Sequence, residues 1–309
     1  MLANFFGKSK PINFIVLLLF FVCVFFLNLF NASFKVDVTL FFSVEIVGVF
    51  SLFIVQFFFV NFIVSKNGLT YDNSYALLFY LLVISFFLPY LYDYQVLCVC
   101  LIQLFFFRKI YSLRTLKEVF KKLFDAGFWL GVMCLFNPFL IVFSLLILSA
   151  LVAHKRVRFQ TIMIPVIGFL VPVFLFFTYS FWFDEMELFR NNFLFYTTYD
   201  FSLYFENRFL IPLITISVLA IFAIFMKTGR ALSVSNSFKK SWSLLLIHLL
   251  ISVGFVLVTF NRDGSELLIA AFPVTVIIAN GFELIKKRFL KEMVLILLIV
   301  SSFLVPFFL

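Results

Sequence analysis

Residues 12–30 read INFIVLLLFFVCVFFLNLF, a run of nineteen residues that follows two cations, Lys8 and Lys10. A helix needs about 20 mostly apolar residues to cross the hydrocarbon core of a bilayer, and this run meets that length. It is longer than the roughly 7–15 apolar residues of a cleavable secretory signal, and no A-x-A cleavage site follows it. The run therefore predicts a membrane anchor whose preceding cations stay in the cytoplasm.

The rest of the chain has the same apolar character. Hydrophobic residues make up 64% of the sequence and charged residues only 13%, and the mean hydropathy is +1.17. Soluble domains average about 45–50% apolar and about 25% charged residues. This composition predicts a polytopic membrane protein and excludes an ordinary soluble enzyme. The 53 Phe residues do not by themselves indicate a binding surface, because lipid-facing positions accept Phe about as well as Leu or Ile.

We expect one all-α integral membrane domain, residues 1–309, built as a polytopic transmembrane helix bundle of about eleven segments, with nine as the lower bound. Asn137-Pro138 divides residues 126–153 and predicts a hairpin, because a proline ends or kinks a helical pattern. The basic pairs on either side of this hairpin, Lys121-Lys122 and Lys155-Arg156, then both stay in the cytoplasm. The expected segments are 12–30, 40–64, 75–92, 94–107, 124–136, 139–153, 161–182, 209–226, 242–260, 265–285 and 292–309.

The basic residues are divided very unevenly between the two sides of these segments. Twenty of the 24 Lys and Arg residues fall on one side, and Lys and Arg in short loops mark the cytoplasmic side. This pattern predicts a cytoplasmic N-terminus and a multi-pass protein of the bacterial inner membrane. Insertion accounts for the basic charge, so the expected partner is the lipid bilayer and not nucleic acid. The four cations on the outer side are Lys35, Arg190, Arg208 and Arg262.

Two loops and one glycine pair have patterns of their own. Residues 108–125 place apolar side chains at helical spacing opposite basic ones, which predicts an amphipathic helix on the inner leaflet. Residues 183–208 are rich in aromatic and acidic residues, which predicts an interfacial loop on the outer side. Gly127 and Gly131 form a G-x-x-x-G pair, which favours close packing of two helices.

The outer side also holds the candidate site. Ten acidic residues fall there against five on the inner side, and acidic residues contribute little to topology. The densest polar stretch, residues 261–266, contains Arg262, Asp263 and Glu266. An arginine at the outer rim suits a phosphate, including a lipid-linked phosphate, through paired hydrogen bonds. The alternative is a plain hairpin, in which Asp263-Gly264 forms a turn and Asp263 or Ser265 caps the next helix.

Several chemistries are excluded by what the sequence lacks. His154 and His248 lie in different segments, and neither has a ligand partner three or four residues away. The four cysteines lie in apolar segments without zinc spacing, so no metal and no cofactor is expected. No P-loop and no G-x-S-x-G motif occurs, which removes the ATPase and serine hydrolase classes.

Two short motifs resemble a known family. The opening residues 6–14, FGKSKPINF, and the outer residues 261–267, NRDGSEL, are similar to a family of uncharacterised multipass inner-membrane proteins of Bacteroidota. Some members of that family are labelled as carotenoid mono-oxygenases. With only two histidines, this chain does not fit a histidine-ligated iron site.

A second resemblance covers the middle of the chain. Residues 136–158 and 165–169 are similar to the corresponding part of GT-C-type glycosyltransferases. That resemblance implies a polyprenyl-phosphate-linked sugar donor and a site at the outer face. The catalytic base would be Asp37, or Glu45 as a fallback, and Arg262 would hold the phosphate. The first outer loop of this chain is short and lacks the acidic pair that is usual in that family.

Three function classes follow from these observations. We expect an integral membrane protein that serves as an envelope-associated subunit or scaffold with a membrane-protein partner. The first alternative is a GT-C-like transferase, which requires Asp37 or Glu45 to converge with Arg262 in an outward cavity. The second alternative is a transporter, which requires broken helices that meet at the bilayer midplane.

Overall fold

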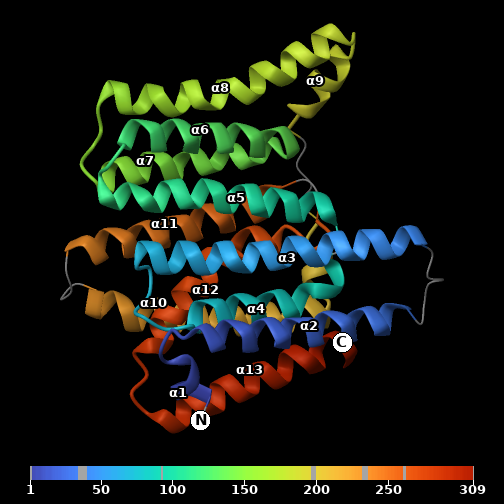
Figure 1. Ribbon diagram of the computed structural model, residues 1–309, viewed down its shortest axis with the longest axis vertical. Coiled ribbons are helices and arrows are strands. Elements are labelled where there is room, and N and C mark those ends of the chain that lie inside the picture. The colour runs from blue at the N-terminus through green and yellow to red at the C-terminus, as the bar shows by residue number, and fades with distance from the viewer. Residues whose placement is uncertain are drawn as a thin grey trace. The chain divides into compact units, whose positions relative to one another are not determined.

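The computed structural model describes residues 2–33, 40–91, 93–195, 200–231, 236–259 and 262–308, and all regular structure in those ranges is helical (Figure 1). The chain forms two compact units, each with its own core. Unit 1 comprises Met1–Leu97, Asp200–Val234 and Arg262–Leu309, and unit 2 comprises Cys98–Tyr199 and Ser235–Asn261. Unit 1 is therefore assembled from three separate stretches of sequence.

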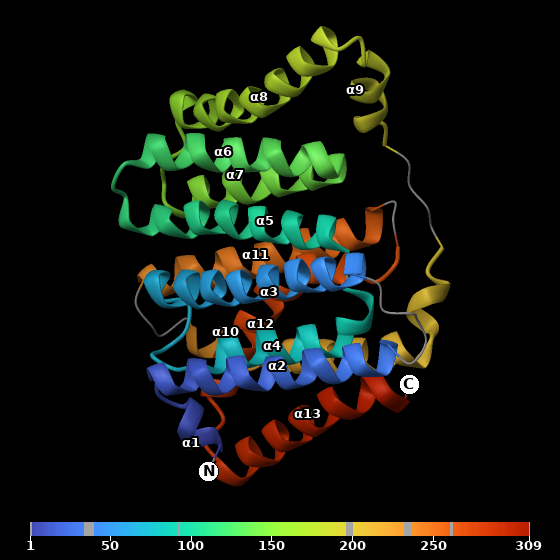
Figure 2. The same ribbon diagram turned by 45° about the vertical axis from the view of Figure 1, so that its right-hand side comes forward.

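Helix α4 (Tyr75–Phe87) forms the centre of unit 1. All of its residues are buried, and it contacts α2, α3, α10, α12 and α13 (Figures 1 and 2). A helix that is apolar on every face is typical of a protein core or of a membrane span. The remaining elements of unit 1 are α1 (Leu2–Phe6), α2 (Pro11–Ser33), α3 (Leu40–Asn67), η1 (Leu88–Tyr90), η4 (Ser202–Phe205), α10 (Asn207–Ala231), α12 (Leu267–Glu283) and α13 (Arg288–Phe308).

Helices α10 and α12 lie side by side and run in the same direction. Gly264, just before α12, faces the ring of Phe209 in the first turn of α10, and Glu283 at the end of α12 pairs with Lys227 near the end of α10. A Cβ atom on Gly281 would lie 2.3 Å from the Cα of Ala223, so only glycine permits this approach of the two backbones. The parallel arrangement explains how both ends of α12 acquire partners from the region of α10.

Unit 2 is held together by a second close helix contact. Cβ atoms added to Gly127 and Gly131 of α6 would lie 2.0 Å from Pro165 O and 2.5 Å from Phe169 O of α8. Figures 1 and 2 both show α6 beside α8, which confirms the predicted packing face. The elements of unit 2 are α5 (Tyr94–Ser112, from Cys98 onward), η2 (Leu113–Thr115), α6 (Val119–Phe136), η3 (Pro138–Phe143), α7 (Ser144–Ala153), α8 (Phe159–Trp182), α9 (Met186–Asn192) and α11 (Asn236–Val258).

Each predicted apolar segment overlaps one of these helices, so the all-α prediction is confirmed. Among the described residues, six helices are long and apolar enough to cross a membrane, which indicates a membrane protein. The number of about eleven spans and the cytoplasmic side of the N-terminus stay predictions. The six helical stretches are Pro11–Leu29, Glu45–Asn67, Tyr94–Thr115, Phe159–Trp182, Asn207–Arg230 and Phe238–Val258.

The structure differs from the prediction of one amphipathic helix over residues 108–125. Residues up to Ser112 continue α5, and residues from Val119 onward belong to α6. Leu116 and Glu118 have φ values of 53° and 47°, and this left-handed backbone breaks the helix between them. The basic residues are therefore divided between α5, α6 and the connection that joins them. Across this connection, Lys109 of α5 forms an ion pair of 2.5 Å with Asp125 of α6.

The structure also describes the predicted hairpin after α6 and part of the predicted loop after α8. At Asn137-Pro138 the chain leaves α6 with an extended Asn137, whose Oδ1 accepts a hydrogen bond of 3.0 Å from Phe139 N. The chain then turns into η3 and α7, as a hairpin requires. Within residues 183–208, the structure describes the short helices α9 and η4.

Candidate functional site

The structure brings three of the five predicted site residues together. Arg262, Asp263 and Glu266 lie in the loop before α12. Glu45 lies on α3 and is exposed, and within the described part of the chain its carboxylate forms no hydrogen bond or ion pair. Asp37 lies outside the described residues. The convergence of Glu45 with Arg262, which the transferase alternative requires, has no support in these contacts.

Glu266 is buried, with 5% of its surface exposed, although no cation is paired with it among the contacts described. Its Oε1 accepts a hydrogen bond from the hydroxyl of Tyr204, and its Oε2 accepts one of 2.9 Å from Gly264 N. Glu266 also immediately precedes α12, so the positive end of the helix dipole favours its negative charge. Neutral donors and the helix terminus together hold this carboxylate.

Gly264 is required by the same loop. Its φ of +92° lies in the region that favours glycine, and a Cβ atom there would lie 2.5 Å from Cε1 of Phe209. Asp263 Oδ1 accepts hydrogen bonds of 3.0 Å from Ser265 N and 2.5 Å from Ser265 Oγ. Asp263 and Ser265 thus close the turn and do not cap α12. That helix begins after Glu266 and has no side-chain cap. The turn prediction is confirmed, and the capping prediction is wrong.

Arg262 belongs to an aromatic contact. Its guanidinium carbon lies 3.9 Å from the centre of the Phe201 ring, close enough for a cation–π interaction. Next to that ring, the backbone N–H and then the hydroxyl of Ser202 lower the pKa of Asp200, and the charge of Arg262 contributes further. Arg262 therefore joins the loop before α12 to the segment around η4.

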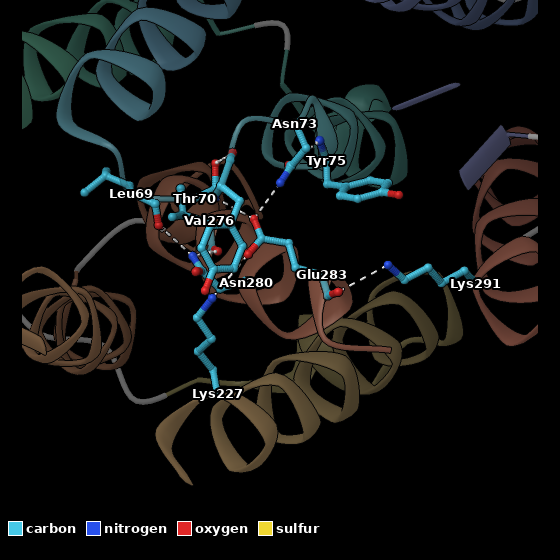
Figure 3. A network of polar contacts seen from close by, with 10 residues as sticks. Leu69, Thr70, Asn73, Tyr75, Lys227, Val276, Asn280, Glu283 and Lys291 are labelled. Atoms are coloured by element: carbon cyan, nitrogen blue, oxygen red, sulfur yellow. Dashed lines mark hydrogen bonds and ion pairs between the residues drawn. The ribbon is translucent and has the colours of Figure 1, made fainter. Parts of the chain in front are cut away.

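The opposite end of α12 carries a polar cluster that the sequence did not predict (Figure 3). Lys227 Nζ lies 3.2 Å from Glu283 Oε2, and only 2% and 5% of the two side chains are exposed. Glu283 Oε1 accepts hydrogen bonds of 2.6 Å from Asn73 Nδ2 and 2.9 Å from Tyr71 N. Lys227 Nζ also lies 4.5 Å from the centre of the Tyr71 ring. We call Tyr71, Asn73, Lys227, Glu283 and Lys291 the Glu283 cluster.

Lys291 completes the cluster from α13. Its Nζ donates a hydrogen bond of 3.2 Å to Glu283 O and lies 5.6 Å from the ring centres of Tyr75 and Phe282 (Figure 3). Deeper in the same end, Asn280 Nδ2 donates hydrogen bonds to Leu69 O and Val276 O, at 2.8 and 2.9 Å. The cluster thus links the α3–α4 connection with the ends of α10 and α12 and the start of α13.

The first residues of the chain join the same end. The carboxylate of Glu292 accepts hydrogen bonds from Leu2 N at 3.0 Å and Ala3 N at 3.3 Å, and the Tyr75 hydroxyl donates one of 2.5 Å to Ala3 O. By sequence, Lys227 is one of the twenty cations, and Glu283 one of the five acidic residues, on the predicted inner side. The missed signal was the position of Glu283 inside the predicted segment 265–285, because ionisable residues within a span are candidates for a specific role.

Unit 2 holds a separate buried polar pair. His248 is fully buried, its Nδ1 lies 2.8 Å from the Tyr111 hydroxyl, and its ring centre lies 4.1 Å from that of Phe107. These contacts are those of a histidine packed in an aromatic core. The described residues contain no group of three or more His, Cys, Asp or Glu side chains that could hold a metal ion.

Comparison with known proteins identifies a family. No curated protein and no solved structure matches the chain. A family model does match, over residues 1–309, and its description is a family of unknown function, DUF6427. Because the match covers all 309 residues, this chain belongs to the DUF6427 family.

Proposed function

We propose that this protein is a non-catalytic integral subunit of the bacterial inner membrane, which holds a membrane-protein partner in the cell envelope. One observation carries the proposal: two charged residues before α12 are engaged by other groups of the protein itself. Glu266 accepts hydrogen bonds from Tyr204 and Gly264, and Arg262 lies over Phe201. A general base needs a lone pair directed at its substrate, and these contacts direct both Glu266 oxygens at the protein.

The two alternatives have less support from the same contacts. A GT-C-like transferase needs Asp37 or Glu45 beside Arg262, and Glu45 is an exposed residue of α3 that forms no hydrogen bond or ion pair with the described residues of that loop. A transporter needs charged or unwound segments in the middle of its helices. The buried pair of Lys227 and Glu283 instead lies where α12 ends.

The same geometry supports the proposed topology. Leu2 and Ala3 contact Glu292, and Lys227 contacts Glu283, so the N-terminus, the end of α10 and the connection between α12 and α13 lie at one end of unit 1. The cations in these regions were assigned to a single side by the distribution of Lys and Arg. We therefore place the Glu283 end in the cytoplasm and the Glu266 end outside.

The experiment that tests the subunit proposal is cross-linking in intact cells, followed by purification of the full chain in lipid discs and quantitative mass spectrometry. We expect one membrane protein at a fixed ratio, which is retained in the Glu45→Gln and Arg262→Ala variants. The purified protein should not consume a polyprenyl-phosphate-linked sugar. Consumption of that donor by wild type, and its loss in Arg262→Ala or Glu266→Gln, would overturn the proposal in favour of the transferase.

A further inference from the structure

A cavity of about 550 Å³ lies beside the Glu283 cluster, and unit 1 supplies all of its lining. The walls come from α1 and the residues after it, from the turn that precedes α4, and from the connection between α12 and α13. This volume is within the range of roughly 300–1,000 Å³ that is typical of small-molecule sites. The charged and amide side chains in its lining are those of Asn4, Lys8, Asp72, Asn73, Glu283, Lys286, Arg288 and Lys291.

Positive charge predominates in this lining. Four cations face two carboxylates, and one of those carboxylates, Glu283, is already paired with Lys227 at 3.2 Å. Asp72 is therefore the remaining acidic group. A cavity with this balance attracts an anion, because the local potential concentrates ligands of opposite charge.

Hydrogen bonds within the protein hold the cavity walls in place. They leave the four cationic groups able to donate further hydrogen bonds. Asn13 is fully buried, and its Nδ2 donates hydrogen bonds to Lys8 O at 2.6 Å, Phe5 O at 3.0 Å and Ser74 Oγ at 3.1 Å. Lys291 Nζ donates one hydrogen bond to Glu283 O. An ammonium group has three N–H donors, so two remain for a ligand. The site is thus preorganised, which lowers the entropic cost of binding.

The chemistry of the cations indicates which anion fits. Arg288 offers a planar guanidinium that matches two oxygens of a phosphate, and the lysines add point charges around it. Asn4 supplies an amide group that can bind the neutral part of a headgroup. A phosphate ester is the ligand class that uses all of these groups.

The outer face of α13 carries an apolar stripe. It recurs every three or four residues, so it follows one face of the helix, and at about 100° per residue this face is opposite to the one that carries Arg288 and Lys291. Exposed apolar side chains of this kind are expected to lie against acyl chains, which places lipid beside the helix that supplies two of the cations. The stripe comprises Phe289, Met293, Leu297, Val300 and Leu304, whose surfaces are 73, 52, 62, 47 and 48% exposed.

We infer that this cavity is a specific site for the phosphate headgroup of an anionic phospholipid, with Lys8, Arg288 and Lys291 binding the phosphate. Basic pockets on the cytoplasmic side of membrane helices are a known means of binding such headgroups. The site lies at the opposite end of unit 1 from Arg262 and does not depend on the proposed partner. It would make the protein sensitive to the composition of the leaflet around it.

The test is a titration of the full-length protein in a neutral detergent, with thermal unfolding as the readout. The probes are dioctanoyl phosphatidic acid, dioctanoyl phosphatidylcholine and inorganic phosphate. Binding to the folded state raises the unfolding temperature, and the stabilisation grows as RT ln(1 + L/Kd), where L is the free ligand concentration. We expect a rise of this form with phosphatidic acid and none with phosphatidylcholine. If inorganic phosphate gives the full effect at the same concentration, the site takes a soluble phosphate and the lipid assignment is wrong.

Two variants and a matched control make the test specific. Arg288→Gln combined with Lys291→Gln should weaken phosphatidic acid binding by roughly 25-fold, at about fivefold per cation removed. Lys8→Gln should weaken it about fivefold, and because the Lys8 side chain is exposed and only its carbonyl is bonded to Asn13, this variant should fold normally. Wild-type affinity in both variants would overturn the inference.

The control removes two exposed cations that do not line the cavity, Arg114 and Lys117, in the connection between α5 and α6. The Arg114→Gln and Lys117→Gln double variant has the same net charge as the Arg288→Gln and Lys291→Gln double variant. We expect it to bind phosphatidic acid within about twofold of wild type. An equal loss of affinity in both double variants would mean general electrostatic attraction and would overturn the assignment of a specific site.

Discussion

Helix α12 has a buried carboxylate at each end, and the two ends hold their charge in opposite ways. Glu283 is the last residue of the helix, where the negative end of the dipole opposes a carboxylate, and it is paired with Lys227. Glu266 precedes the first residue, where the dipole favours a carboxylate, and it is held by Tyr204 and the N–H of Gly264. The comparison teaches that the counter-cation is located where the helix itself cannot stabilise the buried charge.

Removal of the cation should give the largest effect. Lys227→Met leaves Glu283 buried at the unfavourable helix end, so we expect a loss of about 3–5 kcal/mol in the free energy of unfolding. Chemical unfolding in mixed micelles measures this loss. The Lys227→Met and Glu283→Gln double variant should recover much of it, because no unpaired charge remains. A loss of less than about 1 kcal/mol in Lys227→Met alone would contradict the claim that Glu283 needs a counter-cation where Glu266 does not.

The close contact of α10 and α12 should give the second effect. Gly281→Ala places a methyl group against the backbone of Ala223, and we expect a loss of about 1–3 kcal/mol from overpacking. Gly229→Ala is the matched control on α10, since a Cβ atom there meets nothing within 4 Å. That control should be neutral or stabilising by up to about 1 kcal/mol. Equal losses in the two variants would show that the helices are not held together at Gly281.

Substitutions at the Glu266 end of α12 should lower the free energy of unfolding less than Lys227→Met does. In Glu266→Gln the side chain keeps one acceptor oxygen and the helix dipole loses its partner charge, so we expect a loss of about 1 kcal/mol. Tyr204→Phe removes one donor and should cost a similar amount. Unfolding in the same micelles compares both with Lys227→Met. A loss above about 3 kcal/mol in Glu266→Gln would contradict the view that neutral donors suffice here.

The smallest effect is expected at Glu45. This residue is exposed on α3 without a partner in the described ranges, so Glu45→Gln should change the free energy of unfolding by less than about 0.5 kcal/mol. The variant should also retain the cross-linked partner of the proposed subunit. A larger change in stability would mean that Glu45 has a buried contact in the membrane-embedded protein.

Those features that depend on local sequence could be predicted. Apolar runs of sufficient length located the helices, and Asn137-Pro138 located the hairpin. Gly127 and Gly131 were correctly assigned to close packing, because small residues four apart let two helix backbones approach. The turn at Asp263-Gly264 was also foreseen, since its hydrogen bonds join residues two positions apart.

The Glu283 cluster could not be predicted in this way, because its partners are far apart in sequence. Glu283 is 56 residues from Lys227, 210 from Asn73 and 212 from Tyr71. Periodicity shows which residues share a face of one helix, but it does not show which helices are neighbours. The helix predicted over residues 108–125 failed for a related reason: its apolar spacing suited one helix, while Leu116 and Glu118 adopt a left-handed backbone.

The discontinuity of unit 1 has a consequence for synthesis. Helix α4 is buried on all sides, yet α12, one of the helices that cover it, begins about 180 residues later in the chain. At a translation rate of roughly 5–20 residues per second, about 10–40 s pass between the synthesis of α4 and that of α12. A nascent chain that stalls before Leu267 should therefore be cleaved by membrane proteases faster than the full chain, which pulse-chase labelling can measure. Until α12 is made, the surface of α4 that α12 later buries has to be covered by the insertion machinery or by lipid.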